Sequence, residues 1–127
     1  MKVGERHYRS LWADKPGGPV HIIDQTRLPH AFETRSLDSP EAVAEAIETM
    51  RVRGAPLIGV TAAFGVALAM SRDPSDESLA RTAVRLAATR PTAVNLAWAL
   101  ARMRKALEAL APAERAGAAW FEAQSIA

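Results

Sequence analysis

The spacing of apolar and polar positions changes near residue 38. Before it, short apolar clusters alternate with turn residues, as in "HYRSLWA", "KPGGP" and "VHIID". Glycine and proline end strands and form tight turns, so "KPGGPVHIIDQ" predicts a hairpin, and a third short strand is expected near residues 32–36. The pattern therefore predicts a short three-stranded antiparallel sheet in residues 1–37. Such a sheet is marginally stable alone and has to pack on other elements.

From residue 38 onward the apolar positions recur at helical spacing. In "DSPEAVAEAIETM" a cap residue, Asp38 or Ser39, precedes Pro40, which suits the first turn of a helix. Further helices are expected from Pro56 to about Ser71, from "DPSDES" to just before "TRP", over residues 94–110, and from Pro112 onward. The sequence therefore predicts an α+β, mainly α, fold in one domain, with a sheet in residues 1–37 and a bundle of about five helices in residues 38–127.

Composition narrows the function classes. The chain has 127 residues, 49% of them hydrophobic, which suffices for one core. The absence of cysteine excludes disulfides and thiolate chemistry within the chain and favours a reducing, cytoplasmic setting. Sixteen Lys and Arg against fourteen Asp and Glu, without basic clusters interleaved with aromatics, predict no nucleic-acid partner.

Metal and membrane sites are also not expected. The three histidines are scattered, without ligand spacing to one another or to carboxylates. The longest apolar run is shorter than the roughly 18 residues that cross a bilayer. Asp24 ends a strand-like run and is typical of a turn aspartate, with a general base as the less common alternative.

The segment "RVRGAP" precedes a run, "PLIGVTAAFGVALAM", that is apolar nearly all round and therefore predicts a buried helix. In a structural interpretation, a helix ends at Arg51 or Val52, Gly54 stops it, and Pro56 starts the next helix. In a functional interpretation, the unpaired N–H groups of that helix start and an adjacent arginine bind a phosphate. The two interpretations are compatible, and this local signal for anion binding is weak.

A second segment, "ATRPTAVNLAW", repeats this arrangement. Arg90 precedes Pro91, Thr92 is a candidate cap, and Asn95 lies near the next helix start. A single arginine of this kind is typical of a solvated loop. Two arginines at two helix starts make a stronger phosphate hypothesis, because a dianion is commonly held by more than one donor group.

The segments "DQTRLPH", "AEAIETMRVRGAPLIGVTAAFGVALA" and "TRPTAVNLAWALARM", in this order, resemble the N-terminal part of the methylthioribose-1-phosphate isomerases. The resemblance runs over residues 24–103. It implies a small N-terminal domain whose larger, Rossmann-like catalytic domain is absent from this chain, and a homodimer. It also implies substrate contacts, the phosphate included, at Arg53, Gly54, Ala55 and Arg90.

The implied reaction is the isomerisation of 5-methylthioribose 1-phosphate to 5-methylthioribulose 1-phosphate in methionine salvage, without a metal or organic cofactor. The family's catalytic cysteine and aspartate lie in the larger domain, so no catalytic residue is expected here and the chain alone is expected to be inactive. Two alternatives remain. One is a related ribose-1,5-bisphosphate isomerase, and the other is a non-catalytic regulatory or assembly module like the related subunits of translation initiation factor 2B.

Overall fold

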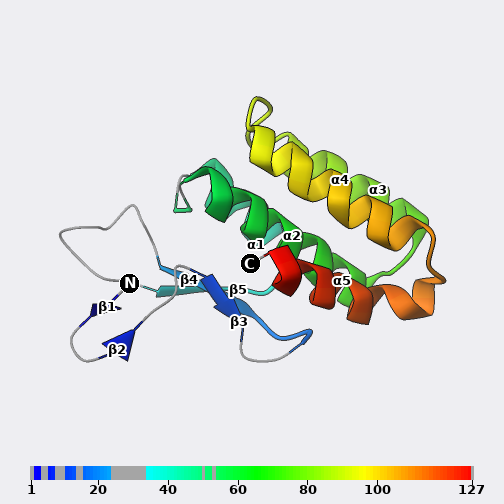
Figure 1. The fold of residues 1–127 in the computed structure, drawn as a ribbon, viewed down its shortest axis with the longest axis horizontal. Helices are drawn as coiled ribbons and strands as arrows, with labels where there is room; N and C mark the ends of the chain where they lie inside the picture. The colour runs from blue at the N-terminus through cyan, green and yellow to red at the C-terminus, as the bar shows by residue number, and fades with distance from the viewer. Residues whose placement is uncertain are drawn as a thin grey trace.

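A small sheet region precedes five helices along the chain (Figure 1). The computed structural model describes residues 2–3, 6–7, 11–13, 16–23, 34–49, 51–52 and 54–126. The strands are β1 (Lys2–Val3), β2 (Arg6–His7), β3 (Leu11–Ala13), β4 (Val20–Ile23) and β5 (Thr34–Leu37). The helices are α1 (Pro40–Glu48), α2 (Ala55–Arg72), α3 (Asp76–Ala87), α4 (Val94–Glu108) and α5 (Pro112–Ile126). The α+β, mainly α, fold predicted from the sequence is confirmed.

Strands β3, β4 and β5 form the predicted three-stranded antiparallel sheet, in that order. The β3–β4 hairpin turns through "PGGP", where Gly17 has a φ of +78° that favours glycine. Trp12 pairs with His21, and His21 pairs with Ser36 in β5. A separate β1–β2 pair, which the sequence pattern did not predict, precedes this sheet. Alternation along the strands buries one set of side chains against the helices: Leu11, Val20, Ile22 and Leu37.

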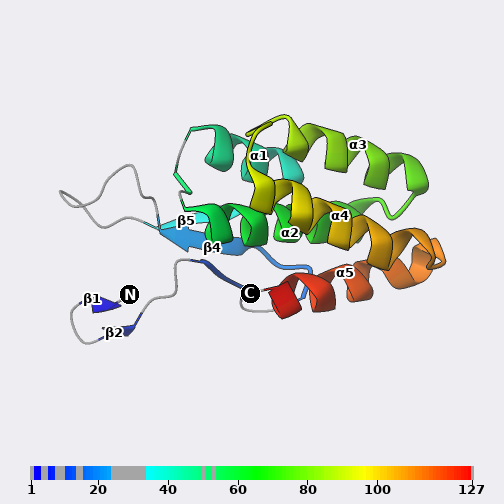
Figure 2. The ribbon, with the colours of Figure 1, turned by 45° about the horizontal axis from the view of Figure 1, so that its top comes forward.

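Helix α2 forms the centre of the fold and contacts the other four helices (Figures 1 and 2). Its residues from Thr61 to Met70 are all buried, as predicted from the apolar run. With its 18 residues, α2 is long and apolar enough to cross a membrane, so the expected shortfall in length was wrong. However, 67% of it is buried inside the fold, which is the property of a core helix.

Two serines cap two of the helices. Ser39 caps α1 by accepting a hydrogen bond from the Ala42 N–H at 3.0 Å, which decides between the two predicted cap residues. Ser75 caps α3 by accepting from the Ser78 N–H at 3.1 Å. Helices α2 and α4 differ, because neither of their starts has a side-chain cap in the described structure.

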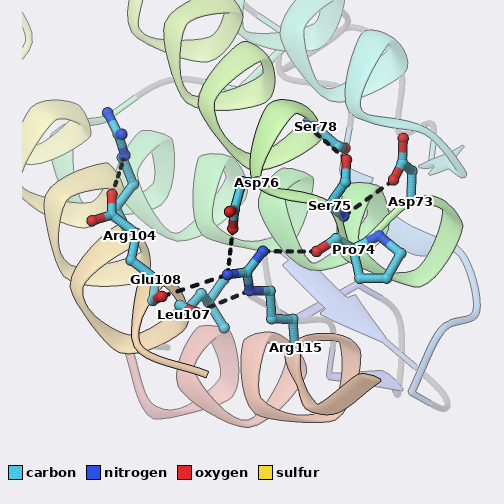
Figure 3. A network of polar contacts seen from close by, with 9 residues as sticks. All are labelled: Asp73, Pro74, Ser75, Asp76, Ser78, Arg104, Leu107, Glu108 and Arg115. Carbon is cyan, nitrogen blue, oxygen red and sulfur yellow. Dashed lines mark hydrogen bonds and ion pairs between the residues drawn. The ribbon is translucent and has the colours of Figure 1, made fainter. Parts of the chain in front are cut away.

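Arg115 attaches α5 to the two preceding helices (Figure 3). This side chain is only 3% exposed. Its Nε donates to the Leu107 carbonyl at 3.0 Å, its Nη1 donates to the Pro74 carbonyl at 2.9 Å, and its Nη2 lies 2.6 Å from Asp76 Oδ1. The guanidinium therefore joins the start of α3, the end of α4 and the first turns of α5, with its donors satisfied by carbonyl and carboxylate oxygens.

Candidate functional site: two uncapped helix starts

The end of α1 differs from the prediction. The helix ends at Glu48, with Thr49 as its C-cap, rather than at Arg51 or Val52. The Thr49 hydroxyl donates to the Glu45 carbonyl at 2.8 Å, and the N–H groups of Arg51 and Val52 both donate to the Ala46 carbonyl. This turn buries Val52 completely. The end of α1 therefore coincides with a turn that buries an apolar side chain, a contact that local spacing does not reveal.

Arg51 makes a contact within the fold. Its Nη1 donates to Glu45 Oε1 at 3.2 Å, so its charge is paired with a carboxylate of α1. Arg53, the arginine to which the family resemblance assigns substrate contact, lies outside the described residues.

Gly54 is not the residue that stops α1 but the N-cap of α2. Its φ of +91° lies in the region that favours glycine, while a β-carbon here would meet nothing within 4 Å. Glycine is therefore needed for its backbone conformation and not for space. The carbonyl of Gly54 accepts the first helical hydrogen bond, from the Ile58 N–H at 3.0 Å.

The first turn of α2 presents N–H groups that have no described side-chain cap. Pro56, the second residue of the helix, has no N–H, so the donors of this turn belong to Ala55 and Leu57. Gly54 and Ala55 are both exposed. The positive end of the α2 dipole thus lies at two exposed residues, where an anion is favoured.

The Arg90 segment forms the second helix start. A turn bond from the Ala93 N–H to the Arg90 carbonyl, 2.9 Å long, precedes α4. The N-cap is Ala93, so the prediction of Thr92 as the cap was wrong, because the helix begins one residue later. Arg90 is half-buried, and no hydrogen bond or ion pair of its side chain with the rest of the chain is found in the described structure.

The two uncapped helix starts lie at the same end of the bundle. Helices α2 and α4 pack side by side and run in the same direction (Figures 1 and 2). A β-carbon on Gly59, the fifth residue of α2, would lie 2.9 Å from the carbonyl oxygen of Asn95, the second residue of α4. At about 1.5 Å of rise per residue, these positions are roughly 6 and 1.5 Å from their helix starts. The structure therefore brings together Gly54 and Ala55 with the start of the helix that follows Arg90.

A cavity of about 450 Å³ lies at the opposite end of α2, where Arg72, Arg81 and Arg85 line it. Arg85 forms paired hydrogen bonds to both Glu48 oxygens, at 2.9 and 3.0 Å, and lowers the pKa of Glu48 below its usual range. Arg72 donates to the Asp38 carbonyl at 3.0 Å. Two of the three cationic groups of this cavity are therefore occupied by contacts within the fold.

The described residues give little support to a metal site or to catalysis by histidine. Among them, no group of three or more His, Cys, Asp or Glu side chains is close enough to hold a metal ion. His21 stacks on Trp12 with ring centroids 5.4 Å apart, and its Nδ1 lies 2.9 Å from the Ser36 hydroxyl. The predicted turn residue Asp24 lies outside the described residues.

Comparisons with known proteins agree with the resemblance seen in the sequence. The model of the Initiation factor 2 subunit family matches residues 51–123. A methylthioribose-1-phosphate isomerase of Acidiphilium cryptum is 59% identical over 127 residues, which cover 99% of this chain and 35% of the relative. A protein described as "Uncharacterized protein in petC 3'region" of Rhodospirillum rubrum is 58% identical over 99% of this chain and 68% of its own length.

Two solved structures share the fold. The 5-methylthioribose 1-phosphate isomerase of Pyrococcus horikoshii superposes with a TM-score of 0.84 at 38% identity, over 94% of this chain and 35% of its own. Translation initiation factor eIF-2B, subunit delta, from A. fulgidus has the same TM-score at 37% identity, over 94% and 36%. The chain therefore spans about a third of the isomerases that it matches, and the fold alone does not separate an enzyme from an initiation factor subunit.

Proposed function

Because the chain belongs to the Initiation factor 2 subunit family, we propose that it is the N-terminal, substrate-binding part of a sugar-phosphate isomerase. The reaction is the conversion of 5-methylthioribose 1-phosphate to 5-methylthioribulose 1-phosphate in methionine salvage. Relatives 54 to 59% identical over at least 99% of this chain, and named methylthioribose-1-phosphate isomerase, support this assignment. The activity belongs to the whole protein, of which this chain corresponds to about 35% in those relatives.

The observation that carries the proposal is the pairing of two uncapped helix starts through the Gly59 and Asn95 contact. The phosphate of the substrate lies between these starts, where backbone N–H groups and two helix dipoles favour an anion. Gly54 and Ala55 hold it at the start of α2, Arg53 contributes a further contact, and Arg90 holds it from the turn before α4. Arginine suits this role because its planar donors bind phosphate oxygens in pairs.

This site positions the substrate and does not perform the proton transfer. An aldose to ketose isomerisation needs an acid/base group at C1 and C2, in addition to a group that holds the substrate in place. The acid/base groups are supplied by the larger domain, so the 127-residue chain binds the sugar phosphate without converting it. We further expect the whole protein to be a cytoplasmic homodimer that needs no metal or organic cofactor.

A non-catalytic assembly module is the second candidate, because the initiation factor subunit superposes as well as the isomerase does. Such a module binds protein partners and has no need to hold a sugar phosphate. Binding of the sugar phosphate by the chain therefore separates the two candidates.

Isothermal titration of the chain with 5-methylthioribose 1-phosphate provides the test, with ribose 1,5-bisphosphate as the competing ligand. Loss of one charge-assisted phosphate contact costs about 2 kcal/mol, so Arg53→Ala and Arg90→Ala should each weaken binding by about thirtyfold. Arg81→Ala, at an exposed position on α3, is the matched control and should leave the affinity unchanged. Equal affinity in all three variants would contradict the site, and tighter binding of the bisphosphate would reassign the substrate.

A further inference from the structure

Helices α4 and α5 together expose large apolar side chains. Val94 and Trp98 lie one turn apart on α4 and are 79% and 54% exposed, and Phe121 on α5 is 68% exposed. The Arg102 guanidinium lies 5.6 Å from the centroid of the Trp98 ring, and its Nε donates to Glu122 Oε2 at 3.0 Å. Arg102, one turn after Trp98 on α4, is thus bonded to Glu122, the neighbour of Phe121 on α5. We name this surface, formed by these five residues, the α4–α5 face.

The α4–α5 face contributes nothing to the core of the described fold. The buried stripe of α4 lies on the opposite side of the helix and consists of Leu96, Leu100, Met103 and Leu107. Within the described part of the chain, four large apolar side chains are exposed, and three of them belong to this face; the fourth is Val84 on α3. Tryptophan, phenylalanine and arginine grouped in this way are typical of the centre of a protein interface.

We propose that the α4–α5 face is the surface on which the remaining two thirds of the isomerase docks. This inference rests on the proposed function. The relatives named as isomerases are nearly three times as long as this chain, which covers 35% of them, so a larger body accompanies this fold. The occupant is that body, the domain that supplies the acid/base groups, and not a second copy of this chain.

The position of the face supports this occupant in two ways. Glu122 belongs to the last turns of α5, so the C-terminal end of this helix lies beside the face. Val94 is the first residue of α4, which places one edge of the face at the uncapped helix start. A domain seated there lies next to the proposed phosphate site, where its catalytic groups can reach the bound sugar.

Hydroxyl-radical footprinting tests the proposal. Three samples are compared. The first is the 127-residue chain alone, and the second is a fusion in which the remaining residues of the Acidiphilium cryptum isomerase follow α5. The third is a mixture of the chain with those remaining residues as a separate polypeptide. Oxidation of Trp98 and Phe121 should fall several-fold in at least one longer form, while Val84, exposed to the same 68% as Phe121, stays equally reactive. Protection is measured without substrate, so protection together with absent isomerase activity would overturn the proposed function and leave the docking surface standing.

Substitutions give the second readout. Binding of the separate polypeptide to the chain should weaken by about thirtyfold with Trp98→Glu, the cost of losing an interface tryptophan, and stay unchanged with Val84→Glu. Unchanged reactivity of Trp98 and Phe121 in both longer forms would overturn the proposal. Concentration-dependent protection in the 127-residue chain alone, with a dimer in sedimentation, would also overturn it, because a second copy would then be the occupant.

Discussion

The Asn95 carbonyl oxygen lies 2.9 Å from the point that a β-carbon on Gly59 would occupy. This close approach of two backbones sets the separation of α2 and α4 where both helices begin. A methyl group at residue 59 would collide with backbone, which has little freedom to move. Gly59 thus fixes the geometry of the proposed phosphate site without being exposed to the ligand.

Gly59→Ala should therefore force the start of α4 away from α2. We expect a loss of about 1 to 3 kcal/mol in the free energy of unfolding, the usual cost of overpacking, and weaker binding of the sugar phosphate. Gly117→Ala is the matched control, because nothing lies within 4 Å of a β-carbon there and the substitution should raise helix stability by about 0.8 kcal/mol. Urea unfolding measures both values, and equal stability of the two variants would contradict the contact.

Gly54→Ala tests a backbone effect instead of a steric one. The site has room for a methyl group, but the φ of +91° is strained for alanine, so we expect a loss of about 1 to 2 kcal/mol. Gly54→Asn should cost less, since asparagine tolerates positive φ better than alanine. An alanine variant as stable as the native chain would show that the N-cap conformation is not the one described.

Arg115→Met should loosen the attachment of α5. The substitution keeps most of the apolar length but removes the Arg115 donor from the Pro74 carbonyl, while the Leu107 carbonyl still accepts from the Leu110 N–H at 3.0 Å. An unsatisfied carbonyl costs about 1 to 3 kcal/mol, and only the partly buried Pro74 carbonyl loses its donor, so a loss of about 2 kcal/mol is expected. Asp76→Asn removes only an exposed carboxylate, so its effect should stay below about 1 kcal/mol. Chemical denaturation of both variants measures the difference, and a reversed order would be inconsistent with the network in Figure 3.

The protonation of the Glu48 carboxylate should make the free energy of unfolding depend on pH. Hydrogen bonds from Arg85 lower the pKa of Glu48 below its ordinary value of 4.5. A carboxyl with a lowered pKa in the folded state stabilises the fold above its unfolded pKa, and this stabilisation is lost as the pH falls through the folded pKa. The free energy of unfolding should therefore depend less steeply on pH below about 4.5 in Glu48→Gln than in the native chain. The exposed Glu77→Gln is the control, and a Glu48→Gln profile that matches the native one would contradict the pairing.

The sequence predicted those elements that depend on local chemistry. Gly17 and its neighbours specify the hairpin, Ser39 caps α1, and the apolar run specifies α2 as the central helix. These features arise from turn geometry, from capping and from burial, all of which act over a few residues.

The sequence did not predict features that depend on contacts between distant segments. The end of α1 at Glu48 coincides with a turn that buries Val52, and the buried Arg115 needs carbonyl groups from two distant parts of the chain. The candidate site shows the same division. The glycine and arginine residues were identifiable from sequence motifs, but the convergence of the two helix starts depends on the close packing at Gly59.

In the proposed site, one sugar phosphate binds at both helix starts at once. A titration of the ¹⁵N-labelled chain with 5-methylthioribose 1-phosphate, followed by NMR, tests it directly. We expect concerted shifts of the amide signals of Ala55, Leu57, Val94 and Asn95 with one common affinity, and no shift at Arg81. Shifts at only one helix start, or none at saturating ligand, would contradict it.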